Sequence, residues 1–495
     1  MSLLLGLDIG TTGAKALLCD GGGNVVATAT AEYPLYSPQP LWSEQNPADW
    51  WRGAREAIRA VALKVDASQI AGLGLTGQMH GAVFLDPDDT VIRPALLWND
   101  QRTAAECDEI TQRVGAARLI EIAGNPPLTG FQAPKILWLR NHEPENYARL
   151  AQVLLPKDYI RLLLTGERAA DASDAAGTLL LDLQARDYSA EILAKLEINR
   201  EWLPRVFEGP EVTGKLKAAV AMELGLPEGL PVIAGGGDNA AAAVGTGVVR
   251  SGVVSSSIGT SGVIFAHSDS IALDPGGRLH TFCHAVPNRY HLMAVTLSAG
   301  GAFRWLRDTL GATSYDDMTS AAAGVSIGAE GLIFLPYLTG ERTPHLDPLA
   351  RGAFVGLTAR HTQAHMIRAV MEGVVYSMRD GLEIMRKLGV PIGQMRATGG
   401  GGRSALWRQM QADTFGGAEV VTLKAEEGPA YGASLLAGVG TGVFANVAEA
   451  VDNCVTITGH AEPNAKAQAQ YEKVYAIYQE LYGKLRESMH QLAAL

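Results

Sequence analysis

The chain has 495 residues, of which 47% are hydrophobic and 19% are charged, a composition typical of globular proteins and unlike that of disordered or fibrous ones. A chain of this length seldom folds around a single core, so we expect two large domains or three of average size. The net charge of −11 disfavours nucleic acids and anionic membranes as partners, because their surfaces attract clusters of Lys and Arg.

Three strands are predicted at the start of the chain, over residues 3–9, 14–19 and 24–32. The intervals between them are too short for crossover helices, so an antiparallel meander is expected. The first interval is the loop GTTG, residues 10–13. Backbone N–H groups of such a loop can approach phosphate oxygens closely, and threonine hydroxyls add further donors. A plain hairpin turn is the alternative for a single loop of this kind.

A helix is predicted after the meander. Asn46-Pro47 has the pattern of an N-cap followed by proline at the first helical position, and apolar residues recur at helical spacing from Trp50 to Val61. Residues 70–77, 93–100 and 230–239 then form short apolar runs closed by Gly or by an acid. These runs are typical of buried strands that present polar residues at their ends, so the chain should alternate α and β elements.

Half a chain later the opening motif recurs. Residues 251–269 contain IGTSG at 258–262, which matches IGTTG at 9–13. A repeat at this separation predicts two similar domains, which we set at residues 1–246 and 247–495. Two such loops, one in each domain, favour phosphate contact over a turn-only interpretation. Neither loop has the P-loop or Rossmann spacing, so both of those assignments fail.

Four glycines at 399–402 lie between an apolar strand and a helix-patterned segment that continues to residue 413. Such a junction lets a flat ligand lie on the backbone, and a helix N-terminus favours phosphate. A flexible linker is the alternative. Gly300-Gly301 is a weaker feature of the same kind, and residues 361–389 and 463–493 predict amphipathic helices, the last of them structural.

Two acids stand where an apolar strand gives way to small residues, Asp8 and Asp238. An ionised carboxylate there is expensive to desolvate unless it meets a cation or accepts a proton. Asp8 suits a Mg²⁺ ion that bridges ATP phosphates, and Asp238 suits a general base for a hydroxyl nucleophile. A cap that accepts backbone N–H bonds is the alternative for either acid.

Polar residues also follow the strand at 70–77, where Gln78, Met79 and His80 occur together. A single His is more often structural than catalytic, but polar donors beside an apolar Met suit a small polyol site. Trp98 could pack on a sugar, and its placement in the core is an equally weighted alternative. The four cysteines have no CxxC spacing, no signal segment opens the chain and no long apolar run occurs, so we expect reduced thiols, a cytoplasmic location and no membrane partner.

The motifs GLDIGTTGAKALL, GQMHG, LWNDQR, GGGDNAAAAVG, SIGTSG and TGGGGRSALWRQMQAD together resemble the FGGY carbohydrate kinases, from about residue 3 to about residue 485. GQMHG with LLWND is most similar to the members that phosphorylate D-xylulose. The family often has Gly where Gln101 stands here, which affects the shape of that loop.

The resemblance implies an α/β protein of two ribonuclease-H-like domains, as in actin, Hsp70 and hexokinase, with ATP and sugar meeting in the cleft. It implies ATP-dependent phosphorylation of D-xylulose to D-xylulose 5-phosphate in pentose catabolism, with Asp238 as base and Mg²⁺ at Asp8 and Asp238. The sugar would contact Met79, His80, Trp98, Asp238 and Asn239. The nucleotide and its phosphates would lie near Gly10, Thr11, Thr12, Lys15, Gly259, Thr260, Gly300, Gly400, Gly401 and Ser404.

Two rival functions stay open at this point. One is an FGGY kinase for ribulose, fuculose, gluconate or glycerol, since a few side chains set the choice of polyol. The other is an ATPase of the actin or Hsp70 type without a sugar substrate, because fold does not fix function. The sequence offers no segment for peptide binding or polymer contacts, and a homodimer is expected only by analogy with the family.

Overall fold

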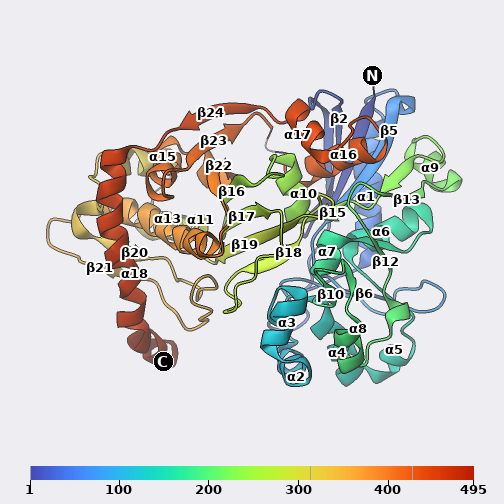
Figure 1. The fold of residues 1–495 in the computed structure, drawn as a ribbon, viewed down its shortest axis with the longest axis horizontal. Helices are drawn as coiled ribbons and strands as arrows, with labels where there is room; N and C mark the ends of the chain where they lie inside the picture. Colours follow the sequence, from blue (N-terminus) through green and yellow to red (C-terminus); the bar gives the residue numbers. More distant parts are fainter. Residues whose placement is uncertain (1, 313, 426) are drawn as a thin grey trace.

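The computed structural model describes residues 2–312, 314–425 and 427–495. Each half of the chain forms a seven-stranded sheet, and the two halves lie side by side (Figure 1). The first sheet has the order β13-β14-β5-β1-β2-β3, with β15 also paired to β5. Its strands are β1 (Leu3–Ile9), β2 (Gly13–Asp20), β3 (Val25–Glu32), β5 (Ile70–Gly77), β13 (Val212–Lys215), β14 (Pro231–Ile233) and β15 (Gly236–Gly237).

The second sheet repeats this arrangement. Its order is β18-β19-β17-β16-β22-β23-β24, and its strands are β16 (Gly252–Ile258), β17 (Gly262–Ser268), β18 (His280–Cys283), β19 (Tyr290–Thr296), β22 (Ile392–Thr398), β23 (Glu419–Leu423) and β24 (Ile457–Ala461). In both sheets the first strand pairs antiparallel with the second and parallel with a later strand. Two copies of this ribonuclease-H-like pattern confirm the predicted fold class.

Short strand pairs lie outside the two sheets. They are β4 (Glu44–Gln45) with β7 (Ala95–Leu96), β6 (Val83–Leu85) with β8 (Gln152–Leu154), β9 (Ala169–Asp171) with β12 (Arg205–Phe207), β10 (Leu181–Asp182) with β11 (Asp187–Tyr188), and β20 (Ile333–Leu335) with β21 (Ala353–Val355). Three 3₁₀ turns occur as well, at η1 (Ala67–Gln69), η2 (Arg200–Trp202) and η3 (Ala329–Gly331).

The helices of the N-terminal half are α1 (Pro47–Ala62), α2 (Ala104–Val114), α3 (Ala116–Ala123), α4 (Gln132–His142), α5 (Pro144–Ala148), α6 (Pro156–Thr165), α7 (Ala172–Ala176), α8 (Ala190–Leu196), α9 (Ala218–Leu224) and α10 (Asp238–Gly245). Those of the C-terminal half are α11 (Gly300–Leu310), α12 (Tyr315–Ala323), α13 (Gln363–Lys387), α14 (Gly399–Arg403), α15 (Ala405–Thr414), α16 (Pro429–Gly440), α17 (Val447–Cys454) and α18 (Ala465–Ala493). No described helix is both long enough and apolar enough to cross a membrane.

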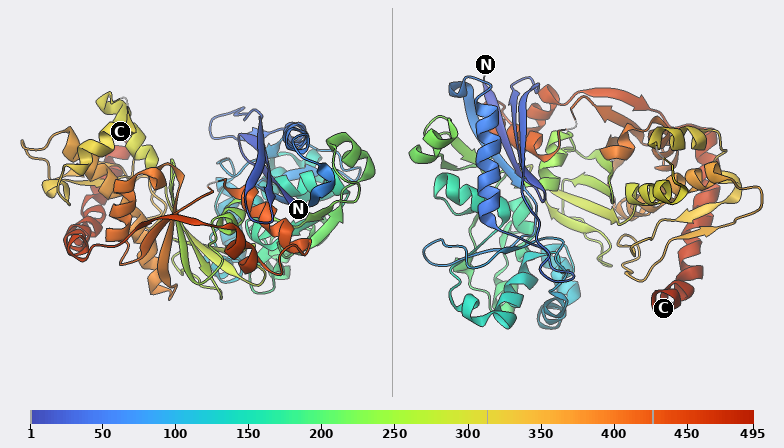
Figure 2. Two further views of the ribbon diagram at one scale, coloured as in Figure 1. Left: turned by 90° about the horizontal axis from the view of Figure 1, so that it is seen from above. Right: turned by 180° about the vertical axis from the view of Figure 1, so that it is seen from behind.

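The core of each half lies between its sheet and its helices. In the first half, α1 covers one face of the sheet, and its buried residues Trp50 and Ile58 pack in one cluster with Leu5 and Leu73 (Figure 2). The N-cap prediction for this helix is confirmed, because the Asn46 side chain accepts a hydrogen bond from the Ala48 N–H. In the second half, α13 and α18 contribute to the core beside β16 and β17.

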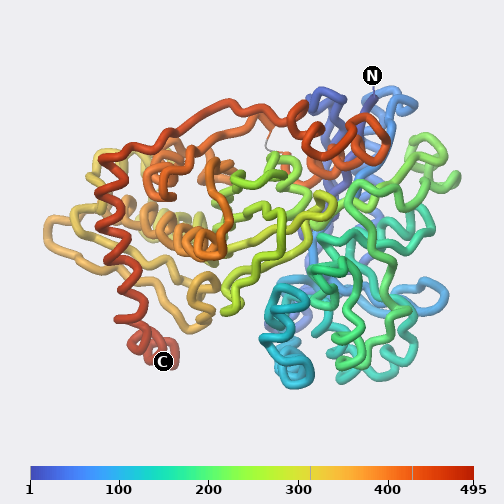
Figure 3. The backbone as a smooth tube through the Cα atoms, in the orientation of Figure 1, coloured from blue at the N-terminus to red at the C-terminus, as the bar shows by residue number. Residues whose placement is uncertain are grey.

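One helix from late in the chain returns to the first sheet. Helix α16 packs against β1 and β5, as the red segment among the blue strands shows (Figure 3). The contact requires glycines, because a Cβ at Gly6 would lie 1.9 Å from the Ala430 carbonyl oxygen and one at Gly74 would lie 1.9 Å from that of Ala433. Residues 429–440 therefore complete the N-terminal half of the molecule.

Two sequence predictions need correction. The strand expected over residues 93–100 contains only Ala95–Leu96, since the chain turns before Trp98 and exposes it. The glycine run at 399–402, expected to precede a helix, is itself the short helix α14. The terminal helix prediction is confirmed, because α18 covers Ala465–Ala493. The four cysteines are all free.

Candidate active site

The GTTG loop between β1 and β2 turns its carbonyl groups into the protein. The Tyr33 hydroxyl donates to the Gly10 carbonyl at 2.6 Å, the Gln45 amide donates to that of Thr11 at 2.6 Å, and the Tyr33 N–H donates to that of Thr12 at 3.2 Å. Among the described residues, nothing accepts a hydrogen bond from the N–H groups of Thr11 and Thr12. In a loop whose carbonyl groups are hydrogen-bonded to the protein, the free backbone N–H groups can bind an anion.

The loop between β16 and β17 is built in the same way. The Gly259 carbonyl accepts from the Gly300 N–H at 2.8 Å, and the Thr260 carbonyl accepts from those of Ala299 and Gly301, both at 2.9 Å. These hydrogen bonds anchor the loop to the N-terminus of α11. A Cβ at Gly300 would lie 2.4 Å from the Gly259 carbonyl oxygen, so only glycine fits there.

Helix α14 lies against the end of β16, next to this second loop. A Cβ at Gly401 would lie 2.5 Å from the Ile258 Cβ, whereas one at Gly400 would meet nothing nearer than 3.9 Å. Gly401 is therefore a packing contact and Gly400 faces open space. Ser404 has a structural role here, because its hydroxyl accepts from the Trp407 N–H and caps α15.

Asp8 is a partly buried acid beside the first loop, and its Oδ1 atom is buried without a hydrogen-bond partner among the described residues. Burial, and next the negative charge of Asp238, raise the pKa of Asp8 to about 7, while the charge of Lys15 opposes them. Lys15 itself is paired with Glu427, at 2.7 Å between Nζ and Oε2. A buried carboxylate oxygen that accepts no hydrogen bond and lies near a second acid is chemically suited to a divalent cation.

Asp238 is the first residue of α10. Its Oδ1 accepts from the Asn239 N–H at 2.7 Å and from the Asn239 side-chain amide at 3.0 Å. Burial raises the pKa of Asp238 to about 6 against the lowering effect of these bonds. The second oxygen, Oδ2, accepts no hydrogen bond from the part of the chain that the structure describes, so it is available to a ligand hydroxyl. Asn239 thus orients Asp238.

A buried ionic cluster supports the backbone before Asp238, and sequence reasoning missed it. The Gly237 N–H donates to the Ser173 hydroxyl at 3.1 Å, and Ser173 in turn donates to Asp171. Lys157 lies 2.7 Å from Asp171 and 2.6 Å from Asp158, and all three charged side chains are fully buried. The available signal was the run of charged residues Lys157, Asp158 and Arg161 in a helix whose other residues are mostly apolar.

Met79 and His80 follow β5 and lie beside the Asp238 turn. A Cβ at Gly237 would lie 2.8 Å from the Met79 side chain, so Met79 packs directly on that glycine. His80 Nδ1 is 2.6 Å from the Gly177 carbonyl, which can only accept, so Nδ1 carries the proton and Nε2 is a free acceptor. Burial lowers the pKa of His80 to about 3, and the ring is neutral at physiological pH.

Trp98 connects the sugar-side residues to the first loop. It is 47% exposed, so the alternative of a core Trp is wrong. Its Nε1–H donates to the Thr11 hydroxyl at 3.0 Å, and that hydroxyl donates to the Gln78 side chain at 3.1 Å. Met79 thus lies next to Asp238 through Gly237, and Trp98 is bonded to the first loop through Thr11. An acid with a free carboxylate oxygen and a loop with free backbone N–H groups are features that phosphotransferase sites use.

The family comparison agrees with this class. Residues 3–245 match the FGGY family of carbohydrate kinases, N-terminal domain, and residues 254–441 match the C-terminal domain of the same family. The chain therefore belongs to the FGGY family of carbohydrate kinases, and the predicted resemblance is confirmed. An ATPase of the actin or Hsp70 type without a sugar substrate is not favoured.

Individual relatives extend over the whole chain. The xylulose kinase of Escherichia coli (strain K12) is 42% identical over 98% of this chain and 99% of its own. A crystal structure of a xylulose kinase from Brucella ovis has a TM-score of 0.92 at 39% identity, covering 98% of this chain and 99% of that one. A gluconate kinase structure from Lactobacillus acidophilus has a TM-score of 0.94 at 29% identity, with 99% of both chains covered.

Proposed function

We propose that this protein transfers the γ-phosphoryl group of ATP to the terminal hydroxyl of D-xylulose, giving D-xylulose 5-phosphate and ADP. The observation that carries this proposal is the free Oδ2 of Asp238, next to Met79 and His80 and near Asp8. The choice of sugar is supported by the full-length relatives named xylulose kinase, which reach 42% identity.

Asp238 is the proposed general base. With a pKa of about 6 it is ionised at neutral pH yet still basic enough to take a proton from a hydroxyl, and such a base contributes roughly 10²- to 10⁴-fold to a rate. Asn239 occupies one carboxylate oxygen, so the other meets the nucleophile in a fixed orientation. His80 Nε2 would accept a hydrogen bond from a second sugar hydroxyl.

The two loops are the proposed phosphate site. The free N–H groups of Thr11 and Thr12 and the second loop would hold the phosphates between them, since phosphoryl transfer depends mainly on positioning and charge neutralisation. The open space at Gly400 and the neighbouring Gly401, Gly259 and Thr260 would hold the nucleotide. Exclusion of water by the two halves would favour the sugar as acceptor.

Asp8 and Asp238 would hold a Mg²⁺ ion. The unpartnered Oδ1 of Asp8 and the mutual repulsion of the two acids fit a divalent cation. When bound, the metal neutralises charge on the phosphates.

The proposal is tested by ADP release in a coupled assay with D-xylulose, D-ribulose, L-fuculose, D-gluconate and glycerol, and with no sugar as control. We expect kcat/KM for D-xylulose to exceed that for gluconate and glycerol by at least about 100-fold, because buried donors and acceptors left unpaired by the wrong ligand are strongly penalised. Higher kcat/KM for gluconate or glycerol would contradict the choice of sugar.

A further inference from the structure

Arg342 lies at the edge of the proposed sugar site, on the segment 336–352 between β20 and β21. It is partly buried. Burial lowers the pKa of Arg342 against the raising effect of the Glu341 charge, but no acidic side chain of the described residues forms an ion pair with it. The neighbouring Glu341 is already used, because its carboxylate accepts from the Thr296 hydroxyl and from the Leu297 N–H. A desolvated guanidinium that forms no ion pair is costly to keep, so an acceptor on a ligand would stabilise it.

Among the described residues, the side chain that bonds to the guanidinium is a neutral acceptor. Arg342 Nη1 lies 3.4 Å from His280 Nε2. The Asn125 amide nitrogen donates to two carbonyls, so its Oδ1 must accept from His280 Nδ1 at 2.7 Å. His280 therefore carries its proton on Nδ1 and accepts at Nε2. One N–H of Arg342 is aligned by this contact, and the others are left for a ligand.

His280 and His80 belong to one aromatic cluster. His80 packs edge-to-face on Phe131 at 4.8 Å, and His280 stacks on Phe282 at 5.7 Å, while Phe131 and Phe282 are 6.2 Å apart. Arg342 thus lies on the cluster that holds His80. The charge of Arg342 also contributes, after burial, to the low pKa of both histidines.

The two groups complement one end of a ketose. At C1 and C2 such a sugar carries a hydroxyl, which can donate, and a carbonyl oxygen, which can only accept. His80 Nε2 needs a donor, and the free N–H groups of Arg342 need an acceptor. We propose that Arg342 donates a hydrogen bond to the sugar carbonyl and so selects a ketose over the corresponding polyol. This inference rests on the proposed function, and it places the carbonyl end opposite Asp238.

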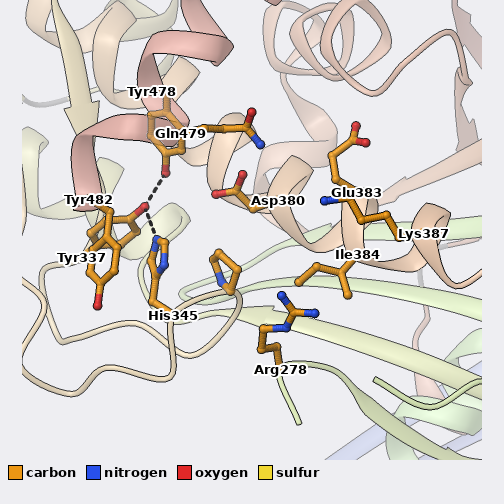
Figure 4. Close-up of a pocket in the computed structure, with 11 residues that line it drawn as sticks. Arg278, Tyr337, His345, Asp380, Glu383, Ile384, Lys387, Tyr478, Gln479 and Tyr482 are labelled. Carbon is orange, nitrogen blue, oxygen red and sulfur yellow. Dashed lines mark hydrogen bonds between the residues drawn. The ribbon is translucent and has the colours of Figure 1, made fainter. Parts of the chain in front are cut away.

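Hydrogen bonds and a ring stack fix the position of the segment 336–352, which carries Arg342. Figure 4 shows the His345 ring hydrogen-bonded to the Tyr337 hydroxyl at 3.1 Å, and Tyr337 to Tyr478 of α18 at 3.0 Å. The His345 ring also stacks on Tyr482 at 3.6 Å. The Thr343 hydroxyl donates to the Arg278 carbonyl at 2.7 Å. These contacts hold the guanidinium in place before sugar binds, and preorganisation of this kind strengthens a specific hydrogen bond.

The test compares D-xylulose with xylitol, which lacks the carbonyl, in the wild type and in Arg342→Ala. We expect kcat/KM for D-xylulose to fall about 10- to 100-fold, the effect of one charge-assisted hydrogen bond. The value for xylitol should change less than about threefold, so that discrimination between the two substrates collapses. Arg342→Gln keeps N–H donors without the charge and should recover part of the discrimination.

Arg278→Ala is the matched control. This variant also removes one guanidinium, but Arg278 is paired with Asp274 and is not proposed to contact the sugar. The ratio of kcat/KM for D-xylulose to kcat/KM for xylitol should therefore stay within about twofold of wild type. Thermal unfolding of each variant establishes that it is folded.

Equal losses for both substrates in Arg342→Ala, or a rise in KM for ATP alone, would overturn the inference. A wild-type enzyme that is active on D-xylulose with unchanged discrimination in Arg342→Ala contradicts this inference only. A wild type with no activity on D-xylulose contradicts the proposed function itself.

Discussion

Asp8 and Asp238 are partly buried acids that repel one another, and neither has a salt-bridge partner among the described side chains. Burial and the charge of Asp238 raise the pKa of Asp8 to about 7. Since the folded state then binds a proton that the unfolded state releases between about pH 4 and pH 7, this group makes the protein less stable as pH rises through that window. Folding alone does not favour an ionised Asp8 at this position.

Asp8→Asn should therefore be more stable than wild type at pH 8 without metal. Removal of the unpaired charge should gain about 1–3 kcal/mol, and the gain should disappear near pH 4, where wild-type Asp8 is protonated. Thermal unfolding across pH measures this. Mg²⁺ should raise the melting temperature of wild type but not that of the variant, and Asp88→Asn on the surface should behave as wild type. If Asp8→Asn is less stable than wild type at pH 8, the interpretation that ionised Asp8 destabilises the fold is wrong.

At the scale of elements, glycines decide how the loops and helices around the cleft meet. Helix α14 approaches the end of β16 so closely that a Cβ at Gly401 would lie 2.5 Å from Ile258, whereas Gly400 points into open space. Adjacent residues of one short helix thus have different roles, one in packing and one next to the proposed nucleotide.

Gly400→Ala and Gly401→Ala separate these roles. The first should leave the melting temperature nearly unchanged and raise KM for ATP several-fold, because the added methyl group enters the ligand space. The second should destabilise the protein by about 1–3 kcal/mol, because it overpacks the contact with β16. KM for the sugar should stay within about twofold in Gly400→Ala. If instead Gly400→Ala unfolds easily and Gly401→Ala does not, the orientation of α14 is wrong.

Local pattern was enough to predict much of this architecture. The strands at 3–9 and 70–77 and the terminal helix were predicted within two residues at each end, because their periodicity and caps are local signals. The repeated glycine loop predicted the paired sheets. The segment at 93–100 was predicted wrongly, since an apolar run does not reveal where the chain turns to expose Trp98.

Contacts between distant residues were beyond local pattern. The Tyr33 and Gln45 side chains that hold the first loop, and the Lys157 cluster behind Gly237, come from segments with no motif of their own. Asn239, which was expected on the sugar, also orients Asp238. The proposed roles of the remaining site residues stay predictions.

At the scale of the whole molecule, the two halves are joined by more than the chain connection. Helix α16 packs on the first sheet through Gly6 and Gly74, and the pair between Lys15 and Glu427 connects β2 to the residues just before that helix. Figure 1 shows the two halves side by side, with one glycine loop in each. We propose that the two glycine loops share one phosphate site.

The role of Asp238 as general base is tested most directly by the rate of D-xylulose 5-phosphate formation in wild type and in Asp238→Asn, measured together with ATP binding. We expect the wild type to form one sugar phosphate per ATP consumed. Its kcat/KM should fall below about pH 6, because Asp238 is protonated there. We also expect a loss in kcat of at least about 100-fold in Asp238→Asn, with ATP affinity within about threefold of wild type. A variant that keeps kcat within tenfold of wild type would contradict the assignment of Asp238 as the base.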